Sequence, residues 1–250
     1  MILTEKNRIE AFTKKGWWGE DTLYSLFKDA LTSCSDQEAL VDPENRKDIT
    51  GDLPTRLSFN DIDKTVERYA SIFFEHGLRK DDIVIIQLPN IVELPMIYLA
   101  LSKLGIICSP IPMQYGVYEI TSIIAETQPR GFISIQSFNG NAHAEQFSSV
   151  FSNNELKFAL GAINNFVNLH EYSPADESYE SQQSYVQDNA VTANDIFTIC
   201  WTSGTTGTPK GVPRSHNLWL PMAKAAAFVS ETEKGDTLLN PFPMINMASM

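Results

Sequence analysis

The nine residues Ser203–Gly211, with the sequence SGTTGTPKG, bring glycine, hydroxyl and lysine side chains together in one short stretch. Glycine permits positive φ and close backbone approach, so successive N–H groups can point into one concavity and bind an anion. The hydroxyls add hydrogen-bond donors or metal ligands, and Lys210 adds a mobile positive charge. These residue types predict a loop that binds the phosphates of a nucleotide. A flexible Gly/Thr turn with a solvated lysine is the alternative.

The spacing of this loop excludes a Walker A motif. That motif has four residues between its first glycine and the Gly-Lys pair, followed by Ser or Thr. Here only two threonines separate Gly204 from Gly207, and a glycine follows Lys210. Nothing in the chain resembles a kinase catalytic loop either, so a phosphotransferase is disfavoured.

The elements on either side of the loop should place it at the edge of a sheet. Residues 195–201 (DIFTICW) read as a strand covered on both faces, and residues 215–229 as a helix. Open α/β sheets bind ligands at the carboxyl ends of their strands. His216 is expected to start that helix or to face the substrate. Arg214 would either add charge near the phosphates or lie at the surface, and Cys200 would be a small buried hydrophobe.

Strand-like and helix-like segments alternate along the rest of the chain. Further strands are predicted at the start of 38–46 and at 82–88, 106–112, 131–136, 156–163 and 236–240. Helices are predicted within 57–78, 91–105, 117–128 and 142–151, and the acidic, amide-rich stretch 173–194 is expected to be a surface connection. Ser58 and Asp61 approximate a capping box. The alternation predicts an α/β fold with parallel-dominated sheets flanked by helices.

We expect three parts in this chain. Residues 1–57 would contribute to a second sheet, residues 58–230 would form an α/β sub-domain with the phosphate loop at 202–211, and residues 231–250 would begin a second α/β sub-domain. Because the chain stops inside the apolar run NPFPMINMASM, we infer the N-terminal portion of a longer fold. An apolar face near Leu238–Met250 would then be open, and a homodimer is one expectation.

Composition limits the partners and the compartment. The 250 residues carry a formal charge of −12, from 19 Lys and Arg against 31 Asp and Glu. A field of that sign repels nucleic acid and anionic lipid, so neither is an expected partner. Three distant cysteines and four isolated histidines form no readable disulfide framework or metal motif. No apolar run reaches the roughly 20 residues of a membrane span, and we expect a soluble, cytoplasmic protein.

The stretch TSGTTGTPKG resembles the phosphate-loop signature of the adenylate-forming superfamily, which includes acyl- and aryl-CoA synthetases, luciferases and peptide-synthetase adenylation domains. The resemblance extends outward over most of the chain. VDPENR, LSFNDIDKTVERYASIFFEHGLRKDDIVIIQLPN and YLALSKLGIICSPIP are similar, in this order, to the N-terminal region of carboxylic acid:CoA ligases and aryl-acid AMP ligases. PFPMINMA stands where that family has its acyl-binding segment.

The resemblance implies a two-step reaction. A small carboxylic acid attacks the α-phosphorus of Mg-ATP, pyrophosphate leaves, and the acyl group passes to the thiol of coenzyme A or of a carrier protein. It also implies that the β- and γ-phosphates are bound by Thr202, Ser203, Gly204, Thr205, Thr206, Gly207, Thr208, Pro209 and Lys210. Thr206, or else its neighbour Thr205, would face Mg²⁺. The family's catalytic residues would all lie beyond Met250, so none is assigned here.

Asn246 and Met247 are the residues that the resemblance places at the substrate. An amide offers no countercharge to an ammonium group, which disfavours an amino acid. Asn246 could bind a ring hydroxyl of an aryl acid or be a turn residue without ligand contact, whereas Met244, Ile245 and Met247 suit an alkyl or alicyclic acid. Two alternatives to a CoA ligase remain, an aryl-acid AMP ligase that loads a carrier protein and a non-catalytic nucleotide-binding module. In each case we expect the 250 residues alone to turn over poorly or not at all.

Overall fold

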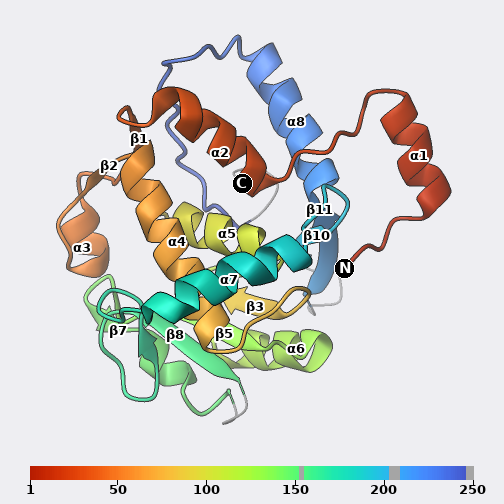
Figure 1. Cartoon of the computed structure of the whole chain (residues 1–250). Coiled ribbons are helices and arrows are strands. Elements are labelled where there is room, and N and C mark those ends of the chain that lie inside the picture. Colours follow the sequence, from red (N-terminus) through yellow and green to blue (C-terminus); the bar gives the residue numbers. More distant parts are fainter. Residues whose placement is uncertain (152–154, 203–208, 246–250) are drawn as a thin grey trace.

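A seven-stranded sheet forms the centre of the structure, a computed structural model that describes residues 1–151, 155–202 and 209–245 (Figure 1). The strand order is β11-β10-β4-β3-β5-β8-β9. The strands are β3 (Ile83–Ile86), β4 (Ile107–Pro110), β5 (Gly131–Ile135), β8 (Leu156–Leu160), β9 (Val167–Asn168), β10 (Ile196–Thr202) and β11 (Lys210–Ser215). All neighbours in this order are parallel except β10 and β11, which are antiparallel. The predicted α/β fold with a parallel-dominated sheet is confirmed.

Helices cover both faces of this sheet. The α-helices of the described residues are α1 (Lys6–Lys14), α2 (Leu23–Cys34), α3 (Arg46–Thr50), α4 (Phe59–Glu75), α5 (Glu93–Leu104), α6 (Val117–Thr127), α7 (Asp176–Asp188) and α8 (His216–Val229), of which α4 and α5 pack on one face and α6 on the other. Successive side chains of β3 point to opposite faces and divide between two cores: Val84 and Ile86 pack with α4 and α5, whereas Ile85 packs with α6. Two covered faces explain why the central strands are mostly apolar and why their few polar side chains, such as Ser109 and Ser134, are buried.

Local sequence signals fix the ends of several helices. Ser58 Oγ accepts the N–H of Asp61, and the N–H of Ser58 donates to the Asp61 carboxylate, which is the predicted capping box at the start of α4. Pro95 lies in the first turn of α5, where a missing N–H is tolerated. The same helix stops at Gly105, whose φ of 71° is left-handed. These signals depend only on residues within the helix or next to its ends.

The helix predicted over 142–151 is wrong. A hairpin of β6 (Ser137–Phe138) and β7 (Asn141–Ala142) occupies the beginning of this region, followed by a short 3₁₀ turn at Ala144–Phe147. Asn139 and Gly140, at φ of 50° and 77°, form the two-residue turn. An Asn-Gly pair is a strong hairpin signal, so here the turn chemistry decided the local structure.

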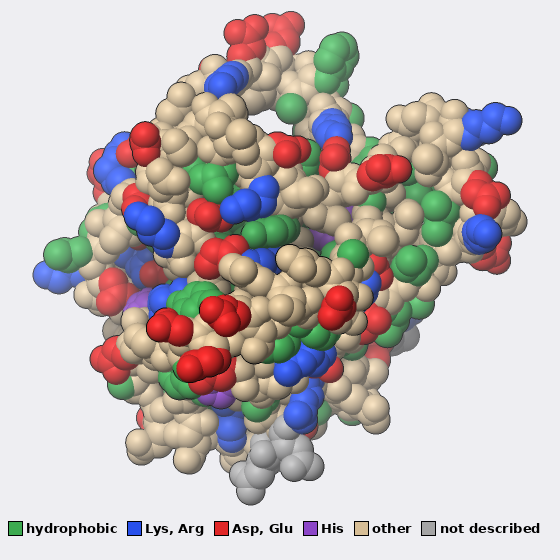
Figure 2. Space-filling view, viewed as in Figure 1, with side chains coloured by type: hydrophobic (Ala, Val, Ile, Leu, Met, Phe, Trp, Pro, Cys, Tyr) green, Lys and Arg blue, Asp and Glu red, His purple; other side chains and the backbone are tan. Residues whose placement is uncertain are grey.

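Three further expectations are corrected. The supposed connection 173–194 contains the helix α7, which packs on α4, with Gln182 fully buried and the Tyr185 hydroxyl accepting the N–H of Lys80 at 2.8 Å. Acidic side chains occupy its outer side (Figure 2). No strand forms at Asp236–Asn240, and the unpredicted strand β11 follows the loop instead.

The N-terminal segment lies at the periphery of the main sheet. Strands β1 (Glu38–Val41) and β2 (Arg56–Ser58) pair with each other in a separate two-stranded sheet, and α1 projects from the body (Figure 1). None of the helices in the described ranges is long and apolar enough to cross a membrane.

Candidate functional site

The two stems of the predicted phosphate loop are the neighbouring strands β10 and β11. Thr202, at the end of β10, pairs with Lys210, at the start of β11, and the Thr202 hydroxyl donates to the Lys210 carbonyl at 3.4 Å. Both residues are exposed, and Pro209 between them is buried. Residues Ser203–Thr208 lie outside the described residues, as do Asn246 and Met247. The structure therefore places the ends of the predicted loop but not its phosphate-binding backbone.

Trp201 and Gly211 fix the geometry of these stems. The two residues face each other in the β10–β11 pair, and the Trp201 indole donates to Ser109 Oγ on β4 at 2.9 Å. A Cβ added at Gly211 would lie 3.2 Å from the Trp201 ring and 2.8 Å from Ile199 Cγ2. This glycine is needed because the strands and the indole approach each other closely. The predicted loop is thus anchored through β10 to the centre of the sheet.

Register places the loop stem beside the end of β4. Thr198 of β10 pairs in parallel with Cys108 of β4. From this pair both strands run in the same direction, β4 to Pro110 and β10 to Thr202, where the predicted loop begins. The carboxyl ends of the parallel strands and the base of the loop therefore share one edge of the sheet, as the doubly wound rule for ligand sites requires.

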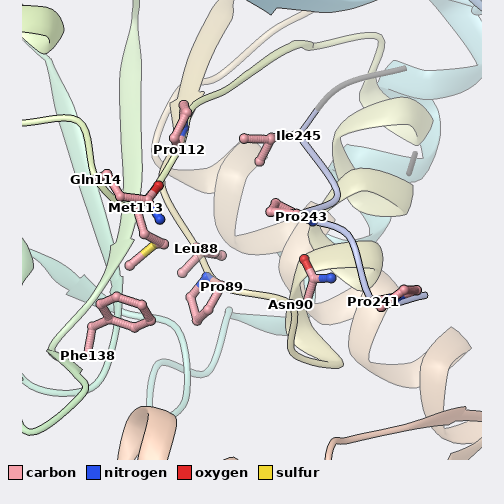
Figure 3. A pocket seen from close by; sticks show the side chains of 10 residues that line it. All are labelled: Leu88, Pro89, Asn90, Pro112, Met113, Gln114, Phe138, Pro241, Pro243 and Ile245. Carbon is pink, nitrogen blue, oxygen red and sulfur yellow. The ribbon is translucent and has the colours of Figure 1, made fainter. Parts of the chain in front are cut away.

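A pocket of about 230 Å³ opens at this carboxyl edge (Figure 3). Its walls come from the segments that follow β3, β4 and β5 and from the segment 241–245. The lining residues are Leu88, Pro89, Asn90, Pro112, Met113, Gln114, Phe138, Pro241, Pro243 and Ile245. Most of them are apolar, and none is charged. The pocket can enclose a small apolar group, and Pro112 in its wall follows the end of β4, the strand that pairs with β10.

Sequence reasoning found only part of this pocket. It singled out the segment around Ile245, but it missed Leu88–Asn90, Pro112–Gln114 and Phe138. These stretches directly follow predicted parallel strands, and the rule that carboxyl ends meet at one edge would have brought them together.

Most of the chain matches the profile of one protein family. The profile of a family described as "AMP-binding enzyme" matches residues 27–250. The chain belongs to the AMP-binding enzyme family. The sequence-based resemblance to adenylate-forming enzymes is confirmed.

Curated relatives of this AMP-binding chain include two kinds of ligase. It is 22% identical over 245 residues to the medium-chain fatty-acid–CoA ligase of Escherichia coli, covering 96% of this chain and 41% of the relative. It is 23% identical over 238 residues to the 2,3-dihydroxybenzoate-AMP ligase of Bacillus subtilis, covering 94% and 41%. The chain therefore spans about two-fifths of the length of these relatives.

Solved structures of AMP-binding relatives share the fold. The apo structure of MbtA from Mycobacterium smegmatis superposes with a TM-score of 0.75 at 19% identity, over 94% of this chain and 41% of that one. A long-chain-fatty-acid-CoA ligase from Archaeoglobus fulgidus gives 0.72 at 22% identity, over 92% and 43%.

Three residues near the loop take structural positions in this AMP-binding chain. Arg214 pairs with Thr198, at the end of the hairpin away from the loop, so its predicted role near the phosphates is disfavoured. His216 starts α8 and is buried; its Nδ1 accepts the N–H of Leu23 at 3.2 Å, and burial lowers its pKa to about 4. Cys200 is buried in β10, and desolvation raises the pKa of its thiol, which disfavours a nucleophilic role.

Proposed function

We propose that the longer protein containing this chain activates a carboxylic acid as an acyl-adenylate, releases pyrophosphate, and then forms a thioester with coenzyme A. The observation that supports this most directly is the shared edge of the sheet: the end of β10, where the Gly/Thr/Lys loop begins, and an uncharged pocket both lie on the side of the carboxyl ends of the parallel strands, in a chain of the AMP-binding family. One site can then hold a triphosphate next to an apolar acid.

In this proposal the loop stabilises charge rather than attacking the substrate. A carboxylate oxygen bonds to the α-phosphorus, the bond from that phosphorus to the bridging oxygen breaks, and both bonding electrons leave with pyrophosphate. The backbone N–H groups and hydroxyls of Ser203–Thr208 would bind the β- and γ-phosphates together with Thr202, Pro209 and Lys210. Donors preorganised toward developing negative charge supply a large share of such catalysis.

The magnesium proposal concerns Thr206. When bound, Mg²⁺ would offset the charge that develops on pyrophosphate. Within the described ranges no three His, Cys, Asp or Glu side chains are grouped so that they could hold a metal ion. From the family resemblance, the proposed protein ligand is the Thr206 hydroxyl, or else that of Thr205, with the phosphates as the anionic donors.

The pocket favours an alkyl or alicyclic acid. Phe138, Met113 and Ile245 offer only apolar surface, and Asn246 and Met247 are proposed to continue this wall. An aryl-acid AMP ligase that loads a carrier-protein thiol is the second candidate. The nearly equal identity to the fatty-acid–CoA ligase and the 2,3-dihydroxybenzoate-AMP ligase, 22% and 23%, supports keeping both. A non-catalytic nucleotide-binding module is the remaining alternative.

The test is pyrophosphate release by the longest natural protein that carries these 250 residues, with Mg-ATP and alkyl, alicyclic and aryl acids. We expect release that depends on an added acid, and thioester formation with coenzyme A. Lys210→Met should lower the rate about 100-fold because one charge-stabilising donor is lost. The matched control Lys47→Met removes an equally exposed lysine on α3 and should leave the rate unchanged.

Two outcomes separate the candidate functions, and a third tests the role of the loop lysine. Transfer to a carrier-protein thiol without transfer to coenzyme A would favour the aryl-acid AMP ligase. Binding of ATP without acid-dependent pyrophosphate release would support the non-catalytic module. Equal loss in the Lys210 and Lys47 variants would contradict the role of the loop lysine. The 250-residue chain alone is expected to bind nucleotide weakly and to release little pyrophosphate.

A further inference from the structure

Residues 241–245, here called the wall segment, reach the pocket as irregular backbone. They form neither helix nor strand, and Pro241 and Pro243 have no N–H to donate. Within the segment, the N–H of Ile245 donates to the carbonyl of Pro243 at 2.8 Å. A segment of this kind needs partners from elsewhere to keep one orientation, because regular secondary structure does not satisfy its polar groups.

Asn90 supplies two of these partners. Its Nδ2 donates to the carbonyl of Phe242 at 2.6 Å, and its Oδ1 accepts the N–H of Met244 at 2.9 Å. The side-chain amide thus pairs with the backbone of the wall segment as a neighbouring strand would. In Figure 3 the amide of Asn90 lies between Pro241 and Pro243, at the rim of the pocket.

Tyr98 supplies the third partner. Its hydroxyl donates to the carbonyl of Met244 at 2.6 Å. The ring is buried in α5, with 4% of its surface exposed, and it packs edge-on against Phe197 of β10. Burial also raises the pKa of the phenol, so the hydroxyl remains a donor over the physiological range. The bond to Met244 therefore starts from a rigid position in the main core.

These three bonds converge on residues directly before the proposed substrate residues. Asn90 and Tyr98 both belong to the unit that connects β3 to β4, whereas the wall segment lies about 150 residues later in the chain. Met244, held from both sides, is followed by Ile245, which lines the pocket, and then by Asn246 and Met247. The bonds thus hold the backbone directly before Ile245, whose side chain lines the pocket.

We propose that Asn90 and Tyr98 are positioning residues of the acid site, which hold the wall segment against the carboxyl edge of the sheet and so set the affinity for the acid. This inference rests on the proposed function. It assigns the effect to the acid and not to ATP, because Asn90 and Tyr98 bond to the wall segment, whereas the described ends of the loop, Thr202 and Lys210, pair with each other.

The first measurement is hydrogen exchange of the peptide containing Phe242–Ile245 in the 250-residue chain. Asn90→Ala and Tyr98→Phe should each speed the exchange of the Met244 amide at least about tenfold, since each removes support from the segment. Asn90→Asp keeps an acceptor for that amide and should be intermediate. Asn60→Ala and Tyr172→Phe remove an amide and a hydroxyl with surface hydrogen bonds elsewhere, to Asp36 and Glu75, and should leave this peptide unchanged.

The second measurement is the kinetics of pyrophosphate release by the longer protein. Asn90→Ala and Tyr98→Phe should raise KM for an alkyl acid such as octanoate about tenfold and leave KM for ATP within about twofold. A merely structural role would raise both or lower the amount of folded enzyme. Unchanged exchange, or equal changes in the two KM values, would overturn the positioning role. Absence of release by the unsubstituted protein with every acid would instead refute the proposed function.

Discussion

Gly211 is the residue at which the packing of the loop stem leaves no room for a side chain. A Cβ there would meet Ile199 at 2.8 Å and the Trp201 ring at 3.2 Å. We expect Gly211→Ala to lower the free energy of unfolding by about 1–3 kcal/mol, because a packed site must shift to admit a methyl group. Urea denaturation measures the change. Gly19→Ala, where nothing lies within 4 Å of the added Cβ, should change it by less than about 0.5 kcal/mol; equal losses would contradict the packing argument.

His216 is the residue that should make the free energy of unfolding depend on pH between about 6.5 and 4. Burial lowers its pKa to about 4 in the folded chain, against about 6.5 when unfolded. The unfolded state therefore binds the extra proton between these values, and the free energy of unfolding falls as pH decreases from 6.5 toward 4. Burial lowers the pKa of His143 as well, whereas Glu93 and Asp195, with pKa values of about 2, lose their contribution only below about pH 4.5.

The measurement is urea denaturation of the chain at pH 7.5, 6.5, 5.5 and 5. His216→Asn keeps an acceptor near the N–H of Leu23 but does not titrate. Its unfolding free energy should fall less between pH 6.5 and 5 than that of the unsubstituted chain. The same slope in both proteins would show that His216 is not the group responsible.

At the scale of elements, α3 is joined to α5 by a buried ion-pair network. Arg46, 2% exposed, pairs with Asp42 at 2.8 Å and with Glu93 at the start of α5 at 2.9 Å. Arg46→Met would leave the buried Asp42 and the largely buried Glu93 without their cation, and we expect a loss of about 3–5 kcal/mol of unfolding free energy. The exposed pair Arg56–Glu38 offers the control: Arg56→Met should leave the midpoint of the same urea titration nearly unchanged, because solvent screens an exposed ion pair. Similar losses would contradict this difference in burial.

At the scale of the whole molecule, the apolar surface around the end of α8 should drive self-association. The exposed side chains there and in the following segment are Phe228, Val229, Leu238, Leu239 and Phe242. Several large apolar side chains left exposed within 15 residues favour contact between molecules. Sedimentation velocity of the 250-residue chain should show concentration-dependent association, which Phe228→Asp with Leu238→Asp reduces. Leu53→Asp, an exposed leucine between α3 and β2, should leave it unchanged; a monomer at all concentrations would contradict the expectation.

The elements that sequence predicted well are those with strong short-range signals. The Ser58–Asp61 capping box marks the start of α4, and continuous apolar runs mark β3, β4, β5 and β10. Helix α7 was missed because its sequence is mostly polar. The side that packs on α4 carries no apolar pattern strong enough to predict a helix. Strand β11 was missed because a strand containing Gly211 and Pro213 forms through pairing with β10, and a sheet edge tolerates such residues.

The sequence by itself determined the family to which the chain belongs, and it is the source of the phosphate-binding role that we propose for the loop Ser203–Gly211. Only the tertiary structure decided the pocket, since Leu88, Pro112, Phe138 and Ile245 come from four separate segments. It also decided the contacts of Asn90 and Tyr98 with a segment about 150 residues away. The physical reason is that parallel strands gather their carboxyl ends at one edge, so these neighbours depend on strand order and register, which no local pattern of residues contains.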